Sequence, residues 1–178
     1  MENNKTENNK TENNKDELNK EDKCENCKCE QSCEQLRVAV FVDGPNMLRK
    51  EFSIDLRDLK ERAEKYGRMV IGKVFVNQFA PEKLVEAIIN EGFESVMVLG
   101  ERNDETGDSA DVDVSMTVAA METILANKVD VIGIATRDAD FLPVIQKAKE
   151  YDHRVVVFGL EPGFSTSLQN AADDLEMM

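Results

Sequence analysis

The stretch VFVDGPN, residues 40–46, indicates the fold of this chain and marks a candidate functional residue within it. It belongs to the apolar run VAVFV (38–42), which is typical of a strand covered on both faces. The run ends at Asp43, and Gly44 and Pro45 favour a turn directly after it. An aspartate in this place can cap a turn, hold a metal ion or attack a phosphate, so the rest of the fold has to decide its role.

Four further short runs rich in valine and isoleucine follow along the chain. They are VIGKVFV (70–76), SVMVL (95–99), VDVIGIA (129–135) and RVVVF (154–158). Each has the length and composition of a buried strand. Together with residues 38–42 they predict five strands.

Helices are predicted between and after these strands. The first spans 53–66, with Ser53 as its cap and Gly67 as its stop, and the second runs from Pro81 to Gly92. The third has an apolar stripe of Val114, Val118, Met121 and Leu125, and the fourth covers about 141–150. The last begins near Thr166, where Thr166 and Gln169 have capping-box spacing. Strands that alternate with helices form mostly parallel sheets. The sequence therefore predicts an α/β domain with a doubly wound, mostly parallel, five-stranded sheet and helices on both faces.

This domain is predicted to span residues 37–178, and residues 1–36 are predicted to be a disordered polar tail. ENNKT occurs at 2–6 and again at 7–11, and ENNKD follows at 12–16. Such a segment has almost no apolar surface whose burial could offset the entropy cost of ordering its backbone.

All four cysteines of the chain lie in this tail, at Cys24, Cys27, Cys29 and Cys33. Their C-x2-C-x-C-x3-C spacing allows the thiolates to converge on one soft metal ion such as Zn²⁺. The spacing matches no standard zinc finger, and it differs from the bacterial iron–sulfur run by one residue and a missing proline. Reduced surface thiols or a redox-labile pair are the alternative, and both interpretations stay open.

The formal net charge of −14, from 36 acidic and 22 basic side chains, excludes a broad basic surface for polyanions. Contact with nucleic acid would need a local basic strip or bridging cations. No apolar run reaches the roughly 18 residues of a membrane span, and the polar N-terminus has no secretory signal. We expect a cytoplasmic protein without membrane contacts.

Acidic residues from three separate segments are predicted to lie at one edge of the sheet. Asp43 and Asn46 follow the first strand, Asp138 and Asp140 follow the fourth, and Asp111 and Asp113 begin the helix after the third. Ligands of such folds bind at the carboxyl ends of the strands, where the strand order reverses. If the order reverses between the first and fourth strands, these acids converge, and Mg²⁺ or Mn²⁺ would relieve their repulsion.

Each acid also has a structural interpretation. Asp140 can cap the helix that follows it, Asp43 can form a turn, and Asp111 or Asp113 can interact with a positive helix end. Residues two apart on a helix point about 200° apart, so we favour Asp113 over Asp111 as the inner ligand. Thr117, four residues later, lies on the same helix face as Asp113.

Other chemistries are disfavoured by the same arrangement. The single histidine, His153, precedes the fifth strand and lies at the opposite edge, which argues against Ser-His-Asp or Cys-His catalysis. No dinucleotide-binding or P-loop glycine motif is present. A haloacid-dehalogenase type phosphatase would need an acid where Pro45 stands.

With these residues in place, the chain resembles an NYN domain of the LabA-like branch of the PIN-like nuclease superfamily. The similar segments are VFVDGPNML, VDVSMTVAAM, ATRDADFLPVI, HRVVVFG and GFSTSLQNAAD, in family order over about residues 37–174. The resemblance implies a ribonuclease in which acids hold Mg²⁺ or Mn²⁺, with Asp43 and Asp138 as principal ligands and Asp113 and Asp140 completing the cluster. Asn46 would orient Asp43 or a phosphate.

Two positions differ from many relatives, which have Lys-Gly in place of Ala110-Asp111 and an acid in place of Ala119. Arg137, beside Asp138, belongs to a set of basic residues that form either a solvated surface or an RNA-backbone strip. The leading hypothesis is a metal-dependent endoribonuclease with Asn46, Arg137 and Thr117 near the substrate. The alternatives are a non-catalytic RNA- or protein-binding regulator with the same fold, and a phosphatase of small esters; the oligomeric state is left open.

Overall fold

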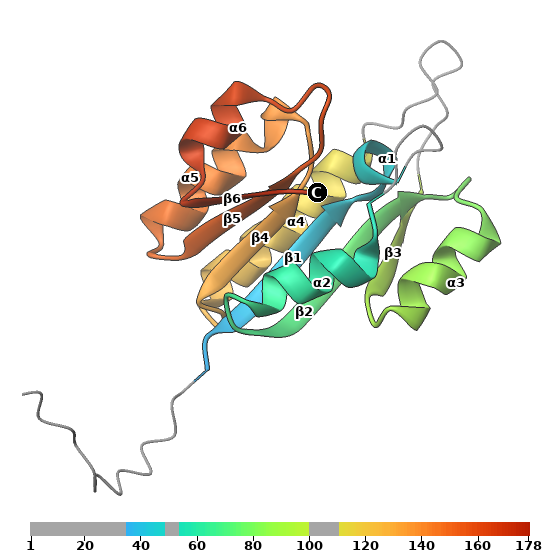
Figure 1. Cartoon of the computed structure of the whole chain (residues 1–178), viewed down its shortest axis with the longest axis horizontal. Coiled ribbons are helices and arrows are strands. Elements are labelled where there is room, and N and C mark those ends of the chain that lie inside the picture. Colours follow the sequence, from blue (N-terminus) through green and yellow to red (C-terminus); the bar gives the residue numbers. More distant parts are fainter. Residues whose placement is uncertain (1–34, 49–53, 100–110) are drawn as a thin grey trace, which may run out of the picture. The chain divides into compact units, whose positions relative to one another are not determined.

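The computed structural model describes residues 35–48, 54–99 and 111–178 (Figure 1). The cysteine cluster, Ser53 and the side chain of Asp111 lie outside the described residues. The expected disordered tail and its zinc site therefore stay predictions.

Within the described residues, six strands form one sheet in the order β3-β2-β1-β4-β5-β6, and each neighbouring pair is parallel. The strands are β1 (Arg37–Asp43), β2 (Arg68–Asn77), β3 (Glu94–Val98), β4 (Val131–Ala135), β5 (Arg154–Gly159) and β6 (Asp174–Met177). The order reverses between β1 and β4, which is the condition under which Asp43 and Asp138 were expected to lie close together. Valines and isoleucines covered on both faces fill the central strands, and every residue of β4 is buried.

The predicted number of strands was wrong, because β6 was missed. Its sequence, DLEM, has only four residues, two of them acidic, and acids are poor strand formers. β6 is instead held by its pairing with β5 and by Arg154, whose Nε and Nη2 donate to the two carboxylate oxygens of Asp174 at 2.6 and 2.9 Å. These are tertiary contacts, which local sequence does not reveal.

Helices cover both faces of the sheet. Helices α1 (Gly44–Met47), α2 (Leu56–Glu64) and α3 (Glu82–Asn90) pack on one face, and α4 (Asp111–Ala126), α5 (Leu142–Glu150) and α6 (Thr166–Ala171) pack on the other, with a 3₁₀ turn at Ala139–Phe141 before α5 (Figure 1). In β1, Val38, Val40 and Val42 face the first layer, whereas Ala39 and Phe41 face the second. No helix in the described part of the chain is long and apolar enough to cross a bilayer.

The apolar stripe predicted for α4 was wrong at three of its four residues, since only Met121 packs against the core. Val114, Val118 and Leu125 are more than half exposed, and the buried stripe is Val112, Met116, Ala120 and Ile124. Both sets recur at helical spacing, because apolar residues lie around most of this helix. Periodicity alone could not decide which set faces the sheet.

We predict that Met116→Ala lowers the free energy of unfolding by about 3 kcal/mol, because a fully buried side chain would leave a cavity. Val118→Ala on the same helix should change it by less than about 0.5 kcal/mol, since Val118 is 52% exposed. Urea unfolding of the full chain measures both values. Equal losses would show that the exposed stripe is covered in solution.

The predicted bounds of one helix and the predicted cap of another need correction. Helix α2 begins at Leu56, where the carboxylate of Asp55 accepts a hydrogen bond from the Arg57 backbone N–H at 2.8 Å, and it ends at Glu64 instead of Tyr66. Helix α6 begins at Thr166 as predicted, but Ser165 is its cap residue and no side chain caps it, so the Thr166–Gln169 capping box is not formed. Helix α3 follows Pro81 and ends before Gly92, as predicted.

His153 lies at the amino-terminal edge of β5, opposite the acidic edge, as expected. Its ring is buried, with Nδ1 3.0 Å from the Val129 carbonyl oxygen and Nε2 3.1 Å from that of Ile124. The imidazole thus ties the end of α4 to the start of β4 and β5, which is a structural role.

Candidate active site at the carboxyl edge of the sheet

The point where the strand order reverses brings Asp43 beside the end of β4. Val42 of β1 is paired with Ala135 of β4, so the next residues, Asp43 and Thr136, lie side by side. Both are completely buried, and with His153 they are the buried polar residues of the described ranges. A buried carboxylate at a sheet edge needs hydrogen-bond partners.

Asp43 has three such partners. Its Oδ1 accepts the Asn46 backbone N–H at 3.2 Å, and its Oδ2 accepts the Asn46 side-chain amide at 2.6 Å and the Thr136 hydroxyl at 2.9 Å. The first contact makes Asp43 the N-cap of α1, in which Pro45 occupies the first turn. The predicted role of Asn46 in orienting Asp43 agrees with this geometry.

Thr136 connects Asp43 to Asp138, and sequence reasoning missed it. Its hydroxyl donates to Asp43 and accepts the backbone N–H of Asp138 at 3.1 Å. A polar residue directly after a fully apolar strand, at the reversal of strand order, was the available signal. The hydroxyl thus connects the carboxylate of Asp43 to the backbone of Asp138.

Asp138 and Asp140 differ in their surroundings. The Asp138 carboxylate accepts the backbone N–H of Asp140 through Oδ1 at 3.0 Å, which makes Asp138 the cap of the 3₁₀ turn. Asp140 is exposed, and it does not cap α5, whose N-cap is Phe141. The structure thus joins Asp43 and Asp138 through Thr136 and leaves Asp140 at the surface next to them.

Burial raises the pKa of the Asp43 carboxyl above its ordinary value of 3.8, because the ionised form loses hydration. Hydrogen bonds from Asn46 and Thr136 offset this only in part, and the negative charge of Asp138 contributes a smaller rise. A carboxylate that is desolvated and faces a like charge is a typical feature of functional sites.

The other predicted residues lie around this pair. Asp113 and Thr117 are half-buried on α4, one turn apart. Arg137 is half-buried and packs against the loop between β5 and α6, where a side chain at Gly163 would come within 3.2 Å of its Nη2. Their contacts with a metal or substrate stay predictions.

The donor atoms fit a hard divalent cation. Asp43 uses three of about four acceptor positions of a carboxylate, which leaves room for a metal ion, and Asp138 supplies a second set of oxygens. In residues 35–48, 54–99 and 111–178, however, no three acidic, histidine or cysteine side chains are gathered closely enough to form a complete metal site. A cation here would take its remaining ligands from water or substrate, as Mg²⁺ commonly does.

Comparison with known proteins shows a family, a relative and a solved structure to which the chain is similar. The NYN domain family model matches residues 37–177. The uncharacterized protein MJ0482 of Methanocaldococcus jannaschii is 52% identical over 137 residues, which cover 77% of this chain and 53% of that protein, so the chain spans about half the length of this relative. A protein of unknown function from Vibrio parahaemolyticus, VPA0982, has a crystal structure that matches with a TM-score of 0.70 at 21% identity, over 83% of this chain and 96% of that one, which shows a shared fold.

Proposed function

Because the chain belongs to the NYN domain family, within the nuclease-like PIN-like superfamily, we propose that it is a metal-dependent endoribonuclease that hydrolyses RNA phosphodiester bonds. One observation carries the proposal: Asp43 is fully buried at the reversal of strand order and is linked to Asp138 through Thr136. Keeping an ionised carboxylate there is costly without a cation. The arrangement is easier to explain as a binding site than as a cap, because a cap residue need not be buried.

In this proposal each residue has a defined task. Asp43 and Asp138 hold Mg²⁺ or Mn²⁺, while Asn46 and Thr136 fix the Asp43 carboxylate in one orientation. The bound cation would supply charge neutralisation at the phosphate and activation of water. Asp113 and Asp140 bind waters at the margin of the site, and Arg137 and Thr117 lie near the substrate.

We predict that Asp138→Asn reduces cleavage by at least about 100-fold, because one of the two metal-binding carboxylates loses its charge. Labelled single-stranded RNA, incubated with the full chain and Mn²⁺, measures the rate. Asp152→Asn is the matched control: Asp152 is exposed in the turn before β5, at the opposite edge, and its positive φ of 63° suits asparagine. Equal cleavage by the wild type and Asp138→Asn would refute the proposal.

A second candidate function is a regulator that binds RNA or a protein without cleaving RNA. Asp43 and Asp138 each cap a helical turn, which is a structural role that needs no metal ion. In addition, no complete metal site is formed among the described residues. RNA that is retained but not cleaved at saturating Mn²⁺ would support this function over the first.

A further inference from the structure

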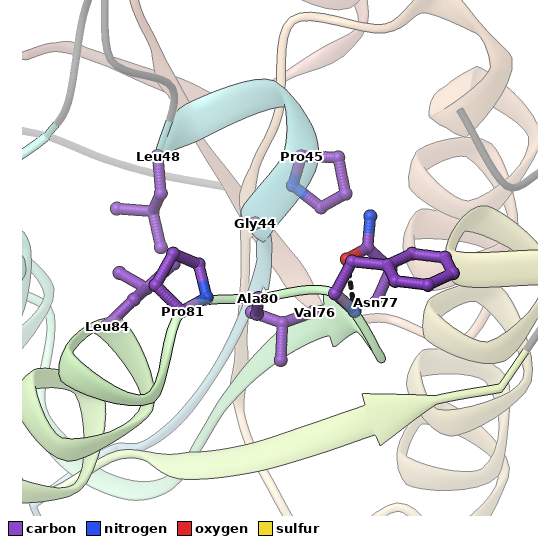
Figure 2. A pocket seen from close by; sticks show the side chains of 9 residues that line it. Gly44, Pro45, Leu48, Val76, Asn77, Ala80, Pro81 and Leu84 are labelled. Carbon is purple, nitrogen blue, oxygen red and sulfur yellow. Dashed lines mark hydrogen bonds between the residues drawn. The ribbon is translucent and has the colours of Figure 1, made fainter. Parts of the chain in front are cut away.

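A pocket of about 220 Å³ lies beside the acidic site, between α1 and the loop that follows β2. It is lined by Gly44, Pro45, Leu48, Val76, Asn77, Phe79, Ala80, Pro81 and Leu84. Gly44 and Pro45 directly follow Asp43, so the pocket begins where the site ends. Figure 2 shows Leu48, Pro81 and Leu84 together at one end and Pro45 and Asn77 at the other.

The pocket contains no charged side chain, although a third of the residues of this chain are charged. Phosphates and metal ions therefore have no charged partner among its lining side chains. Its volume is below the roughly 300–1,000 Å³ of pockets for drug-sized ligands, so it suits one small ring system. These properties describe a site for a flat, uncharged group with a polar rim.

Asn77 provides an oriented polar group at the wall. Its Oδ1 accepts the backbone N–H of Phe79 at 3.0 Å, which fixes the amide, and the amide nitrogen lies toward Pro45 (Figure 2). The loop itself is held by backbone hydrogen bonds from Gln78 to Val98 and from Ala80 to Asn77. Asn77 thus presents a fixed donor, and every nucleobase carries ring or carbonyl acceptors.

Phe79 provides an aromatic surface. The residue is 53% exposed and lines the pocket, so its ring is accessible to a ligand there. Bases of single-stranded nucleic acids stack on such rings, and the contact does not depend on the identity of the base. A stacking residue also supplies affinity that does not depend on positive charge, in a chain whose net charge is −14.

We propose that this pocket binds one unpaired nucleobase of the RNA next to the cleaved phosphate, with Phe79 stacking on the base and Asn77 donating to its edge. The inference rests on the proposed function and adds that the substrate is single-stranded at this point. A paired base would keep its edge and faces within the duplex and could not enter.

The chain has no tryptophan, so Phe79→Trp places a single fluorescent reporter in the pocket of the full chain. We expect a single-stranded RNA oligonucleotide to quench it, and an oligonucleotide with abasic sites, or the same sequence as a duplex, to bind about tenfold more weakly. Tyr151 is 46% exposed and lies at the opposite edge of the sheet. RNA should therefore not quench the fluorescence of a Tyr151→Trp variant. Equal quenching by the abasic oligonucleotide would overturn the proposal.

Cleavage kinetics separate this inference from the nuclease proposal. Phe79→Ala should raise KM about tenfold with kcat little changed, whereas Phe79→Tyr should behave like the wild type. Cleavage by the wild type with no effect of Phe79→Ala would overturn the base pocket alone. Base-dependent quenching without any cleavage would support the pocket and refute the nuclease, and absence of quenching would overturn the pocket whatever the cleavage result.

Discussion

Asp43→Asn should lower metal-dependent RNA cleavage by about 1,000-fold or more while the metal-free domain stays folded. Asp43 is the more buried of the two acids, and Asn46 and Thr136 hold its carboxylate in one orientation, so a neutral amide there removes the better-oriented metal-binding charge. The expected loss exceeds that of Asp138→Asn, since Asp138 lies nearer the surface.

Asparagine can keep the structural role of Asp43. It remains a good N-cap, and its Oδ1 can accept the Asn46 backbone N–H. The Thr136 hydroxyl can accept a second bond, and the Asn46 amide can turn to offer its oxygen. We expect the free energy of unfolding in chelator to change by less than about 1 kcal/mol, whereas Asp43→Ala, which loses the cap and its partners, should lose about 2 kcal/mol.

The pH dependence of metal-free stability should change as well. Burial gives Asp43 a folded-state pKa above its ordinary value of 3.8, so the folded state binds the proton more tightly than the unfolded state does. Its contribution to stability is fully present below pH 3.8 and is lost as pH rises through the raised pKa. Asp43→Asn should remove this loss, which thermal unfolding in chelator across pH 3 to 8 would measure.

Metal binding gives a readout independent of activity. Mn²⁺ at 100 times its Kd should stabilise the wild type by about 2.7 kcal/mol and Asp43→Asn much less. If Asp43→Ala is less stable than Asp43→Asn but Mn²⁺ stabilises neither variant nor the wild type, Asp43 is a helix cap and the metal site is refuted.

The sequence was sufficient for the central part of the fold because that part depends on local patterns. Apolar runs at 38–42 and 155–158 are buried on both faces, and short runs rich in valine are typical of strands within a covered sheet. The exposed edge strand β6 and the buried stripe of α4 could not be predicted. β6 depends on the ion pair between Arg154 and Asp174, and α4 has two apolar faces of which only packing selects one.

The site was predictable to a similar degree. The sequence placed Asp43 and Asp138 at the carboxyl ends of their strands, but the reversal of strand order between β1 and β4, which brings them close, could be stated only as a condition and is found in the structure. Thr136 was not predictable as a bridge, because its role depends on the χ1 rotamer and the register of two strands 93 residues apart. The pocket at Asn77 and Phe79 could not be predicted either, because it forms only where the loop after β2 lies next to α1, which comes from a different part of the chain.

The largest expected effect on stability comes from Gly44→Ala, which should lower the free energy of unfolding by about 3 kcal/mol or more and the melting temperature by about 10 °C. A Cβ at this position would lie 2.3 Å from the backbone carbonyl oxygen of Phe75 and 3.0 Å from a methyl group of Val76. The carbonyl belongs to β2 and cannot move without breaking the sheet, so α1 would have to shift away. Asp43 would move with α1, and cleavage should fall together with stability.

Gly92→Ala distinguishes this clash from a general intolerance of glycine replacement. Gly92 has a φ of +85°, which costs an alanine about 1–2 kcal/mol, but its Cβ would meet only the flexible end of Lys60 at 3.3 Å. Helix propensity alone would favour alanine at Gly44, the first residue of α1, over alanine at Gly92. If Gly44→Ala proves the more stable of the two variants in urea unfolding, the close approach of α1 to β2 is absent in solution, and the pocket between them loses its wall.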